Sequence, residues 1–323
     1  MADSTEGDTD ILYLGLLVPA LITFIAGMGI HSFIIGVNVT DWWKGRPVTP
    51  VDHIVTSLGI SRMGTQCLAI IYLIMDTAFQ IHLDTHVTVF VGSIYDFFIY
   101  ANFWLTSLLS IVFCLKISNF HSRLFLYLRG MIAHRTSNLI AISVLLSIFN
   151  CLMLLMMSIT EVMKNGTYNT TMQNLSMDCT IYMNYFYNYT LGIFIPLFFY
   201  CISSVLLFTS LYHHTTKMKM SSNVTINLGT YYSVMKFVSF TLIYNTIYVI
   251  GHFLGVYYYY FYCVLHLWIF IVLNFVTGLH SSYLIYRTAK LRSQMSKVLQ
   301  NVTDYLLQMK NTETRKSLEV VAV

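Results

Sequence analysis

The stretch VNVTDWWKGRPVTPVDHIVTSLGISR, residues 37–62, joins two long apolar runs through a short patch of charge, tryptophan and proline. Tryptophan is enriched where a membrane meets water, and Lys and Arg are concentrated in cytoplasmic loops. Trp42 and Trp43 therefore indicate a membrane interface. Lys44 and Arg46 indicate that the loop between the two runs is cytoplasmic. The patch predicts a chain that crosses a membrane, turns and crosses back.

The composition indicates that lipid is the solvent of this chain. Of its 323 residues, 56% are hydrophobic and only 10% are charged, and the mean hydropathy is +0.65. A soluble domain usually carries about a quarter charged residues, so this chain has too few charges to cover a wetted surface. Its six cysteines form no CxxC pair, which predicts neither a disulfide framework nor a zinc site.

About 20 apolar residues are needed to cross the hydrocarbon core of a membrane as a helix. Seven runs meet this condition, and each must be helical because lipid offers no partner for free backbone groups. We therefore predict an all-α membrane protein in which residues 11–286 form a seven-transmembrane-helix domain, after an extracellular segment of residues 1–10. The predicted spans are residues 11–37, 54–75, 87–115, 139–159, 189–212, 231–256 and 262–286.

Lysine and arginine set the predicted orientation, because they accumulate on the cytoplasmic side. Fifteen of the eighteen fall in four segments, residues 38–53, 116–138, 213–230 and 287–323. This distribution predicts a multi-pass protein of the plasma membrane, with an extracellular N-terminus and a cytoplasmic C-terminus.

Sequons in the loop of residues 160–188 give a second, independent signal for the same orientation. Such sites are glycosylated only on the side of the membrane opposite the cytoplasm, and this loop lies on that side by the charge argument. We predict glycosylation at Asn165, Asn169 and Asn174. Asn188 abuts the fifth span and is expected to be too close to the bilayer.

The segment after the seventh span, residues 287–323, is predicted to be a cytoplasmic tail with an amphipathic helix. Its apolar residues recur at helical spacing between basic ones, which suits a helix lying on the anionic lipid of the inner leaflet. A solvated and partly helical tail is the alternative. Residues 311–323 are expected to be disordered. The apolar residues are Leu291, Met295, Val298, Leu299, Val302, Leu306 and Met309.

Seven spans with the N-terminus outside is the topology of receptors, although topology alone does not fix function. The sequence has no HExxH, GxSxG or P-loop motif, and no glutamate lies inside a span. We therefore predict no enzyme activity, catalytic residue, metal site or cofactor, and we expect no nucleic-acid partner. No internal repeat or pair of broken helices indicates a transporter, which remains the alternative from a different class.

Four stretches carry a family signature. Residues 27–62 read GMGIHSFIIGVNVTDWWKGRPVTPVDHIVTSLGISR, and residues 103–129 read FWLTSLLSIVFCLKISNFHSRLFLYLR. Residues 203–218 read SSVLLFTSLYHHTTKM, and residues 280–294 read HSSYLIYRTAKLRSQ. They resemble the first two helices, the third helix, and the ends of the fifth and seventh helices of the taste receptor type 2 (bitter receptor) family. The likeness covers about residues 15–295, and the related vomeronasal type 1 pheromone receptors are the alternative.

The resemblance implies a G-protein-coupled receptor bundle that binds small bitter compounds and activates a heterotrimeric G protein of the gustducin/Gi type. It also implies a divergent member, because His31 stands where the family has an asparagine in the first helix. Basic residues at the cytoplasmic helix ends are predicted to dock the G protein, although ordinary positive-inside bias explains them equally well. These residues are Lys116, Arg123, His213, His214 and Lys217.

The resemblance also implies a ligand pocket, at positions that match ligand-facing ones of the family. Its residues predict an aromatic and apolar site that suits bulky hydrophobic ligands. Asp96 is expected at the edge of this pocket, where it pairs either with an amine of the ligand or with an internal partner such as His266. The predicted lining consists of Tyr95, Ile99, Tyr248 and Phe270.

Arg62 lies inside the second span, where a charge is costly unless it faces a partner or a water-filled cavity. We predict that it belongs to a polar activation cluster between the first, second and seventh helices. The alternative is that its side chain extends to the inner headgroups. The predicted cluster consists of His31, Arg62, His280 and Ser281.

Overall fold

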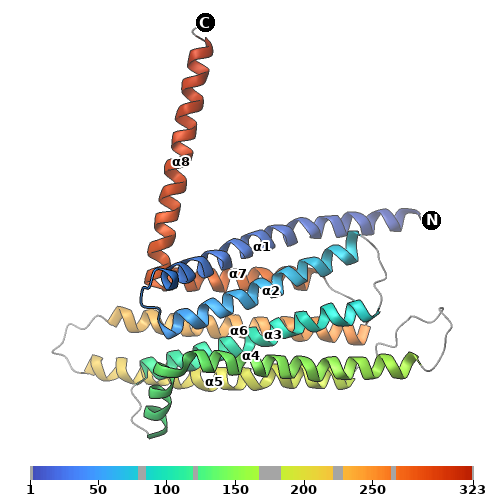
Figure 1. The fold of residues 1–323 in the computed structure, drawn as a ribbon, viewed down its shortest axis with the longest axis horizontal. Helices are drawn as coiled ribbons and strands as arrows, with labels where there is room; N and C mark the ends of the chain where they lie inside the picture. Colours follow the sequence, from blue (N-terminus) through green and yellow to red (C-terminus); the bar gives the residue numbers. More distant parts are fainter. Residues whose placement is uncertain are drawn as a thin grey trace. The chain divides into compact units, whose positions relative to one another are not determined.

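The computed structural model describes residues 3–78, 85–118, 123–166, 183–220, 228–262 and 267–321. Within these ranges the chain forms eight helices and no strand (Figure 1). The helices are α1 (Asp3–Trp43), α2 (Pro50–Ala78), α3 (Thr85–Ile117), α4 (Arg123–Gly166), α5 (Met183–Met220), α6 (Leu228–Tyr262), α7 (Leu267–Arg287) and α8 (Ala289–Val321).

Helices α1 to α7 each contain a segment long and apolar enough to cross a membrane. Each segment overlaps the apolar run predicted for it, so the all-α, seven-helix membrane fold is confirmed. The segments are Gly15–Trp43, Pro50–Ile71, Phe90–Ile117, Arg135–Met157, Tyr189–Thr216, Tyr232–Tyr258 and Trp268–Arg287.

Helix α1 continues through residues that were expected in the first loop. It ends at Trp43 because Gly45 has a φ of 66°, a left-handed conformation that favours glycine. The backbone nitrogen of Gly45 donates to the carbonyl oxygen of Trp42 at 3.0 Å. That of Arg46 donates to the carbonyl oxygen of Asp41, also at 3.0 Å, which completes a Schellman motif. An ion pair of 3.0 Å between the side chains of Arg46 and Asp41 reinforces the turn.

Helix α2 begins with a reciprocal cap. The hydroxyl of Thr49 accepts a hydrogen bond from the backbone nitrogen of Asp52 at 3.2 Å, and the carboxylate of Asp52 accepts one from the backbone nitrogen of Thr49 at 3.0 Å. This is the geometry of a capping box, with Pro50 at the first helical position. The connection between α1 and α2 is therefore residues 44–49, shorter than the predicted loop of residues 38–53.

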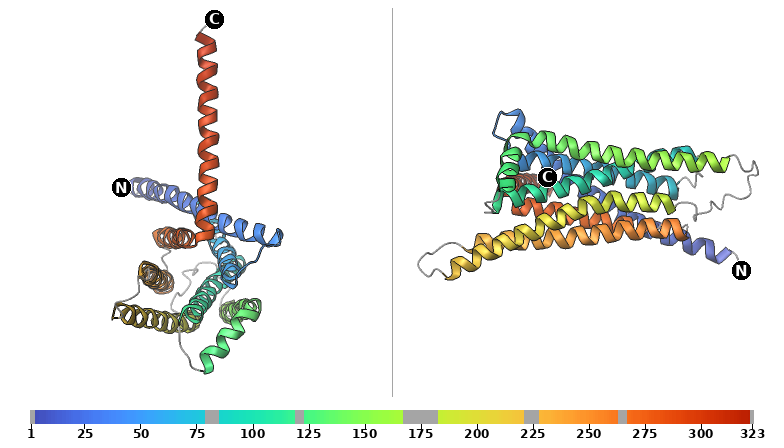
Figure 2. Two further views of the ribbon diagram at one scale, coloured as in Figure 1. Left: turned by 90° about the vertical axis from the view of Figure 1, so that its left-hand side faces the viewer. Right: turned by 90° about the horizontal axis from the view of Figure 1, so that it is seen from below.

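Helix α4 also starts earlier than expected. Residues 123–134 were assigned to a cytoplasmic loop, but they form a helix that turns away from the rest of α4 (Figure 2). The turn falls at Arg135, whose φ of −127° and ψ of 26° are not helical. The segment of α4 that is apolar enough to cross a membrane begins at this residue, so it starts at the bend.

Residues up to His280 form one compact unit, in which α3 is the central helix. It packs against α2, α4 and α5, and it is the most buried of the spanning helices (Figure 2). Around it lies a core of buried aromatic and aliphatic side chains contributed by α3, α4, α5, α6 and α7. This core fixes the faces of the helices that surround the candidate site.

Residues from Ser281 onward form a second unit, which contains the end of α7 and the whole of α8. The apolar residues of α8 at positions 298, 299, 302, 306 and 309 are exposed. The helix continues to Val321, past residue 311, where disorder was expected. The sequence KNTETRKSLEV in this part contains no Gly or Pro to stop a helix.

Candidate ligand-binding site

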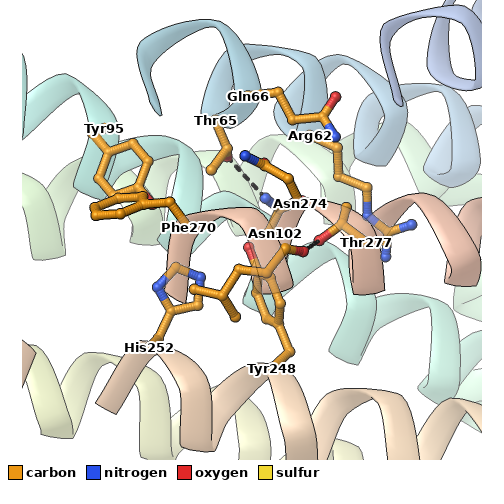
Figure 3. A pocket seen from close by; sticks show the side chains of 11 residues that line it. Arg62, Thr65, Gln66, Tyr95, Asn102, Tyr248, His252, Phe270, Asn274 and Thr277 are labelled. Atoms are coloured by element: carbon orange, nitrogen blue, oxygen red, sulfur yellow. Dashed lines mark hydrogen bonds between the residues drawn. The ribbon is translucent and has the colours of Figure 1, made fainter. Parts of the chain in front are cut away.

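A cavity lies between α2, α3, α6 and α7 (Figure 3). The space between its atoms is about 270 Å³, counting the part that opens outward. The described residues that line it are Arg62, Thr65, Gln66, Tyr95, Asn102, Tyr248, His252, Phe270, Leu273, Asn274 and Thr277.

Each of the four helices presents one stripe of side chains to this cavity. On α3, Tyr95 and Asn102 are separated by seven residues, which is close to two helical turns. On α6, Tyr248 and His252 are separated by four residues and share a face. The lining residues of α2 and α7 follow the same three- and four-residue spacing, so helical periodicity alone brings them together.

One wall of the cavity is aromatic. The rings of Tyr95 and Phe270 meet with centroids 6.2 Å apart, which joins α3 to α7. The ring of Tyr248 lies 5.4 Å from that of Phe103 and 4.5 Å from the imidazole of His252. Tilted and edge-on contacts of this kind are the favoured arrangements of aromatic pairs.

The wall formed by α2 and the inner part of α3 is polar. The Nδ2 atom of Asn102 donates a hydrogen bond of 3.0 Å to the hydroxyl of Thr65, which itself donates to the carbonyl oxygen of Ser61 at 3.1 Å. The amphipathic cavity therefore offers ring faces on one side and hydrogen-bonding groups on the other.

Three of the predicted pocket residues, Tyr95, Tyr248 and Phe270, line this cavity, whereas Ile99 does not. Ile99 is fully buried in the core around α3. At about 100° per residue, Asn102 lies about 20° to one side of Tyr95 and Ile99 about 40° to the other. The cavity is on the side of Asn102.

Asp96 is buried but does not line the cavity either. Its charge acts on Cys151 of α4 and Tyr189 of α5, so it lies on the α4 and α5 side of α3. One residue along a helix is a rotation of about 100°, which explains why Tyr95 faces the cavity and its neighbour does not. His266, considered as a partner, lies outside the described residues.

The structure brings Arg62, His31 and His280 together inside the bundle. Arg62 is only 2% exposed, and the two histidines are fully buried. Arg62 acts electrostatically on both of them. The guanidinium therefore lies among protein groups in this structure, rather than at the level of the headgroups. Ser281 belongs to the second unit, in which it is buried.

Two further residues complete this cluster. The guanidinium carbon of Arg62 lies 5.5 Å from the ring centroid of Tyr244, whose hydroxyl accepts a hydrogen bond of 3.4 Å from Nη2. The His280 ring stacks on the same tyrosine with centroids 4.1 Å apart. The Oε1 atom of Gln66 lies 3.3 Å from Nδ1 of His31. Gln66 follows Arg62 by one helical turn, so the sequence could have indicated that Gln66 belongs to the cluster. Nothing in the sequence indicated the contact between Arg62 and Tyr244.

The predicted G-protein-docking residues lie at one end of the bundle, where α3 and α5 end and α4 begins (Figure 1). Lys116, Arg123 and His213 are exposed, and His214 is partly buried. The side chain of Lys217 is not among the described side chains.

The predicted glycosylation sites lie mostly outside the described part of the chain. Asn165 is in the last turn of α4, but its side chain is not among the described ones. Residues 169 and 174 lie outside the described residues.

The described residues form seven helices that can each cross a membrane, with a cavity among them, which is the architecture expected of a membrane receptor. A sequence model of the family described as "Taste receptor protein (TAS2R)" matches residues 10–303. The chain therefore belongs to the taste receptor type 2 family, as its motifs predicted. It is a multi-pass membrane protein and a chemosensory G-protein-coupled receptor, and it is not an enzyme.

The relatives are similar at modest identity. Taste receptor type 2 member 50 of Homo sapiens is 29% identical over 226 residues, which cover 68% of this chain and 73% of the relative. Member 143 of Mus musculus is 28% identical over 202 residues, 60% of this chain and 66% of the relative. Member 125 of Rattus norvegicus is 36% identical over a shorter stretch of 136 residues, 41% and 42% of the two chains.

Proposed function

We propose that this receptor binds small bitter compounds in the cavity between α2, α3, α6 and α7 and activates a G protein of the gustducin/Gi type. The observation that carries this proposal is that the cavity and the polar cluster share residues. Arg62 and Gln66 line the cavity and also belong to the cluster. A ligand in the cavity therefore contacts the cluster directly.

A second contact supports the same route. Tyr248, in the aromatic wall, stacks on Tyr244 of the cluster with ring centroids 5.6 Å apart. A ligand that prefers one arrangement of these rings shifts the receptor toward that arrangement by its difference in affinity for the two states. We propose that the polar cluster of His31, Arg62 and His280 has two arrangements, and that the ligand stabilises one of them.

The proposed orientation places the N-terminus outside the plasma membrane and the C-terminus in the cytoplasm, because of the distribution of Lys and Arg. Residues 1–10 are then extracellular, and residues 287–323 are a cytoplasmic tail whose amphipathic helix contacts membrane lipid. The bundle end that carries Lys116, Arg123 and His213 faces the G protein, together with the neighbouring His214 and Lys217. The sequons at residues 165, 169 and 174 carry glycans on the opposite side.

The ligand site is tested by calcium responses in cells that express the receptor with a chimeric G protein. A panel of bitter alkaloids, terpenoids and bile acids provides the agonist. Phe270→Ala is expected to lower agonist potency by about tenfold or more, since it removes one aromatic wall. Phe275→Ala is the matched control, because Phe275 is on the same helix but 54% exposed. Equal losses from the two variants would refute the site.

Coupling is tested separately, with purified gustducin and Gi heterotrimers and receptor-containing membranes. Lys116→Ala and His214→Ala are expected to slow nucleotide exchange at unchanged surface expression and unchanged agonist potency, because they alter only the docking end. Full exchange activity in both variants would show that these residues reflect charge bias alone.

A further inference from the structure

Several polar atoms of the residues that line the cavity have no hydrogen-bond partner in the part of the chain that the structure describes. They include Nε2 of His252, Oδ1 of Asn102 and Nε2 of Gln66, which belong to residues only 5%, 4% and 1% exposed. A buried polar group without a hydrogen-bond partner destabilises the folded protein. Such groups are satisfied either by ordered water or by a ligand.

The imidazole of His252 is held in place by two aromatic rings. It meets the ring of Tyr248 edge-on, at 4.5 Å and 76°, and the ring of Phe103 at 6.2 Å and 72°. Figure 3 shows the imidazole pointing from α6 toward Tyr95 and Phe270. Because both neighbours are aromatic walls, they fix the ring without using its Nε2 atom. A ring nitrogen of histidine either donates or accepts a hydrogen bond, depending on the tautomer.

The charge of the lining limits which ligands fit. Arg62 lines the cavity, and none of the described lining residues is acidic. Asp96, the buried acid of α3, lies instead on the side of α4 and α5. A cationic group in this cavity would meet the like charge of Arg62, and repulsion of that kind is strong away from water. The lining therefore favours uncharged ligands over protonated amines.

We propose that His252 is the specificity-determining residue of the site, and that it selects uncharged, compact apolar molecules that carry one hydroxyl or carbonyl oxygen. The apolar skeleton packs against Tyr95 and Phe270, and the oxygen hydrogen-bonds to Nε2 of His252. Asn102 Oδ1 is the second partner for ligands that can donate. This inference rests on the proposed function, since it takes the cavity to be the agonist site.

The test uses four probes with one bicyclic skeleton: camphor, which only accepts a hydrogen bond, borneol, which donates and accepts, the hydrocarbon camphane, and the protonated amine bornylamine. Calcium responses are measured for the wild type, His252→Phe, His252→Gln and the control Thr241→Val. Phenylalanine keeps the aromatic contacts and removes the nitrogen, while glutamine restores an amide near its position. Thr241 is buried on the same helix and bonds only its own helix, to the Phe237 carbonyl oxygen.

In the wild type, camphor and borneol are expected to be about tenfold more potent than camphane, and bornylamine to be weakest. His252→Phe should abolish the advantage of camphor over camphane, His252→Gln should restore part of it, and Thr241→Val should leave it unchanged. An advantage that survives in His252→Phe would overturn the proposal, because another lining group would then bind the oxygen. Silent camphor and borneol in a receptor that answers other panel compounds would overturn the ligand class.

Silence toward the whole panel would mean that the proposed function fails, and a ligand-independent measurement still decides the role of His252. The apparent Tm of the purified, unliganded receptor is compared between the wild type, His252→Phe and Thr241→Val. If Nε2 is held for a ligand, removing it relieves an unsatisfied group and the Tm stays equal or rises. A fall in Tm specific to His252→Phe would show that the nitrogen has a structural role and would overturn the proposal.

Discussion

At the scale of single residues, Arg62 shows how a cation is accommodated inside a membrane-spanning bundle. Its guanidinium lies over the ring of Tyr244. A cation over an aromatic face contributes about 2 kcal/mol when it is removed from water. The stacking of His280 on the same ring shows that this tyrosine is the centre of the cluster.

Two substitutions of Tyr244 separate the ring from its hydroxyl. Tyr244→Phe removes only the long hydrogen bond from Arg62 at 3.4 Å and is expected to cost about 1 kcal/mol or less. Tyr244→Leu also removes the aromatic face and is expected to cost about 2 kcal/mol more. The apparent Tm of the purified receptor should therefore fall slightly for the first variant and clearly for the second. Equal falls would assign the stabilisation to the hydroxyl.

Part of this cluster was predictable from sequence. Arg62 was recognisable because a charge interrupts an apolar run, and His31 and His280 because they are the polar residues of neighbouring spans. Tyr244 was not, since it is 182 positions away along the chain and one of 24 tyrosines. The position of Ile99 outside the cavity was not predictable either. Ile99 is rotated by about 60° from Asn102 around α3, which turns it away from the cavity.

At the scale of elements, the approach of α3 and α5 depends on the absence of one side chain. Gly192 of α5 faces Tyr100 of α3, and a Cβ atom there would lie 2.6 Å from a ring carbon. Tyr100 is fully buried, with its ring tilted against that of Tyr189 at 5.8 Å. The ring therefore has no free space to move into, and the two helices are held at this distance by a glycine.

Gly192→Ala is accordingly expected to destabilise the receptor. Overpacking costs about 1–3 kcal/mol, which exceeds the gain of about 1 kcal/mol from replacing a helical glycine by alanine. The control is Gly29→Ala, because no atom lies within 4 Å of a Cβ at Gly29. The apparent Tm should fall for Gly192→Ala and stay equal or rise for Gly29→Ala. A fall of the same size in both would mean that the contact with Tyr100 does not limit the packing.

The existence of the seven spans was predictable, because lipid requires long apolar helices. The residues at which the helices begin and end were less predictable. The Schellman turn at Gly45 and the capping box at Thr49 shorten the first connection, and hydropathy does not report such local hydrogen bonds. Residues 123–134 were too polar to be read as a span, and hydropathy does not distinguish a loop from a helix outside the membrane.

At the scale of the whole molecule, the seven spans place the connections between helices alternately at the two ends of the bundle. The turn between α1 and α2, the start of α4 and the end of α5 share one end (Figure 1). Twelve of the eighteen Lys and Arg residues lie outside the spans, either between them at this end or in the tail after α7, by position in the sequence. The end of α4 and the start of α5 lie at the other end (Figure 1). The distribution of charge and the positions of the sequons are independent signals, and both predict the same topology.

This topology makes a prediction about glycosylation. Asn165, Asn169 and Asn174 follow the fourth span and are expected to carry glycans, whereas Asn301 has an equally good sequon on an exposed position of α8. Because glycans are added only on the side opposite the cytoplasm, position 301 should be unmodified. Glycosidase treatment should increase the electrophoretic mobility of the wild type and of Asn301→Gln by the same amount, and should not change that of a variant in which the three sites after α4 are Gln. A reduced shift in Asn301→Gln would invert the topology, and the bundle end with Lys116 and His213 would then face away from any G protein.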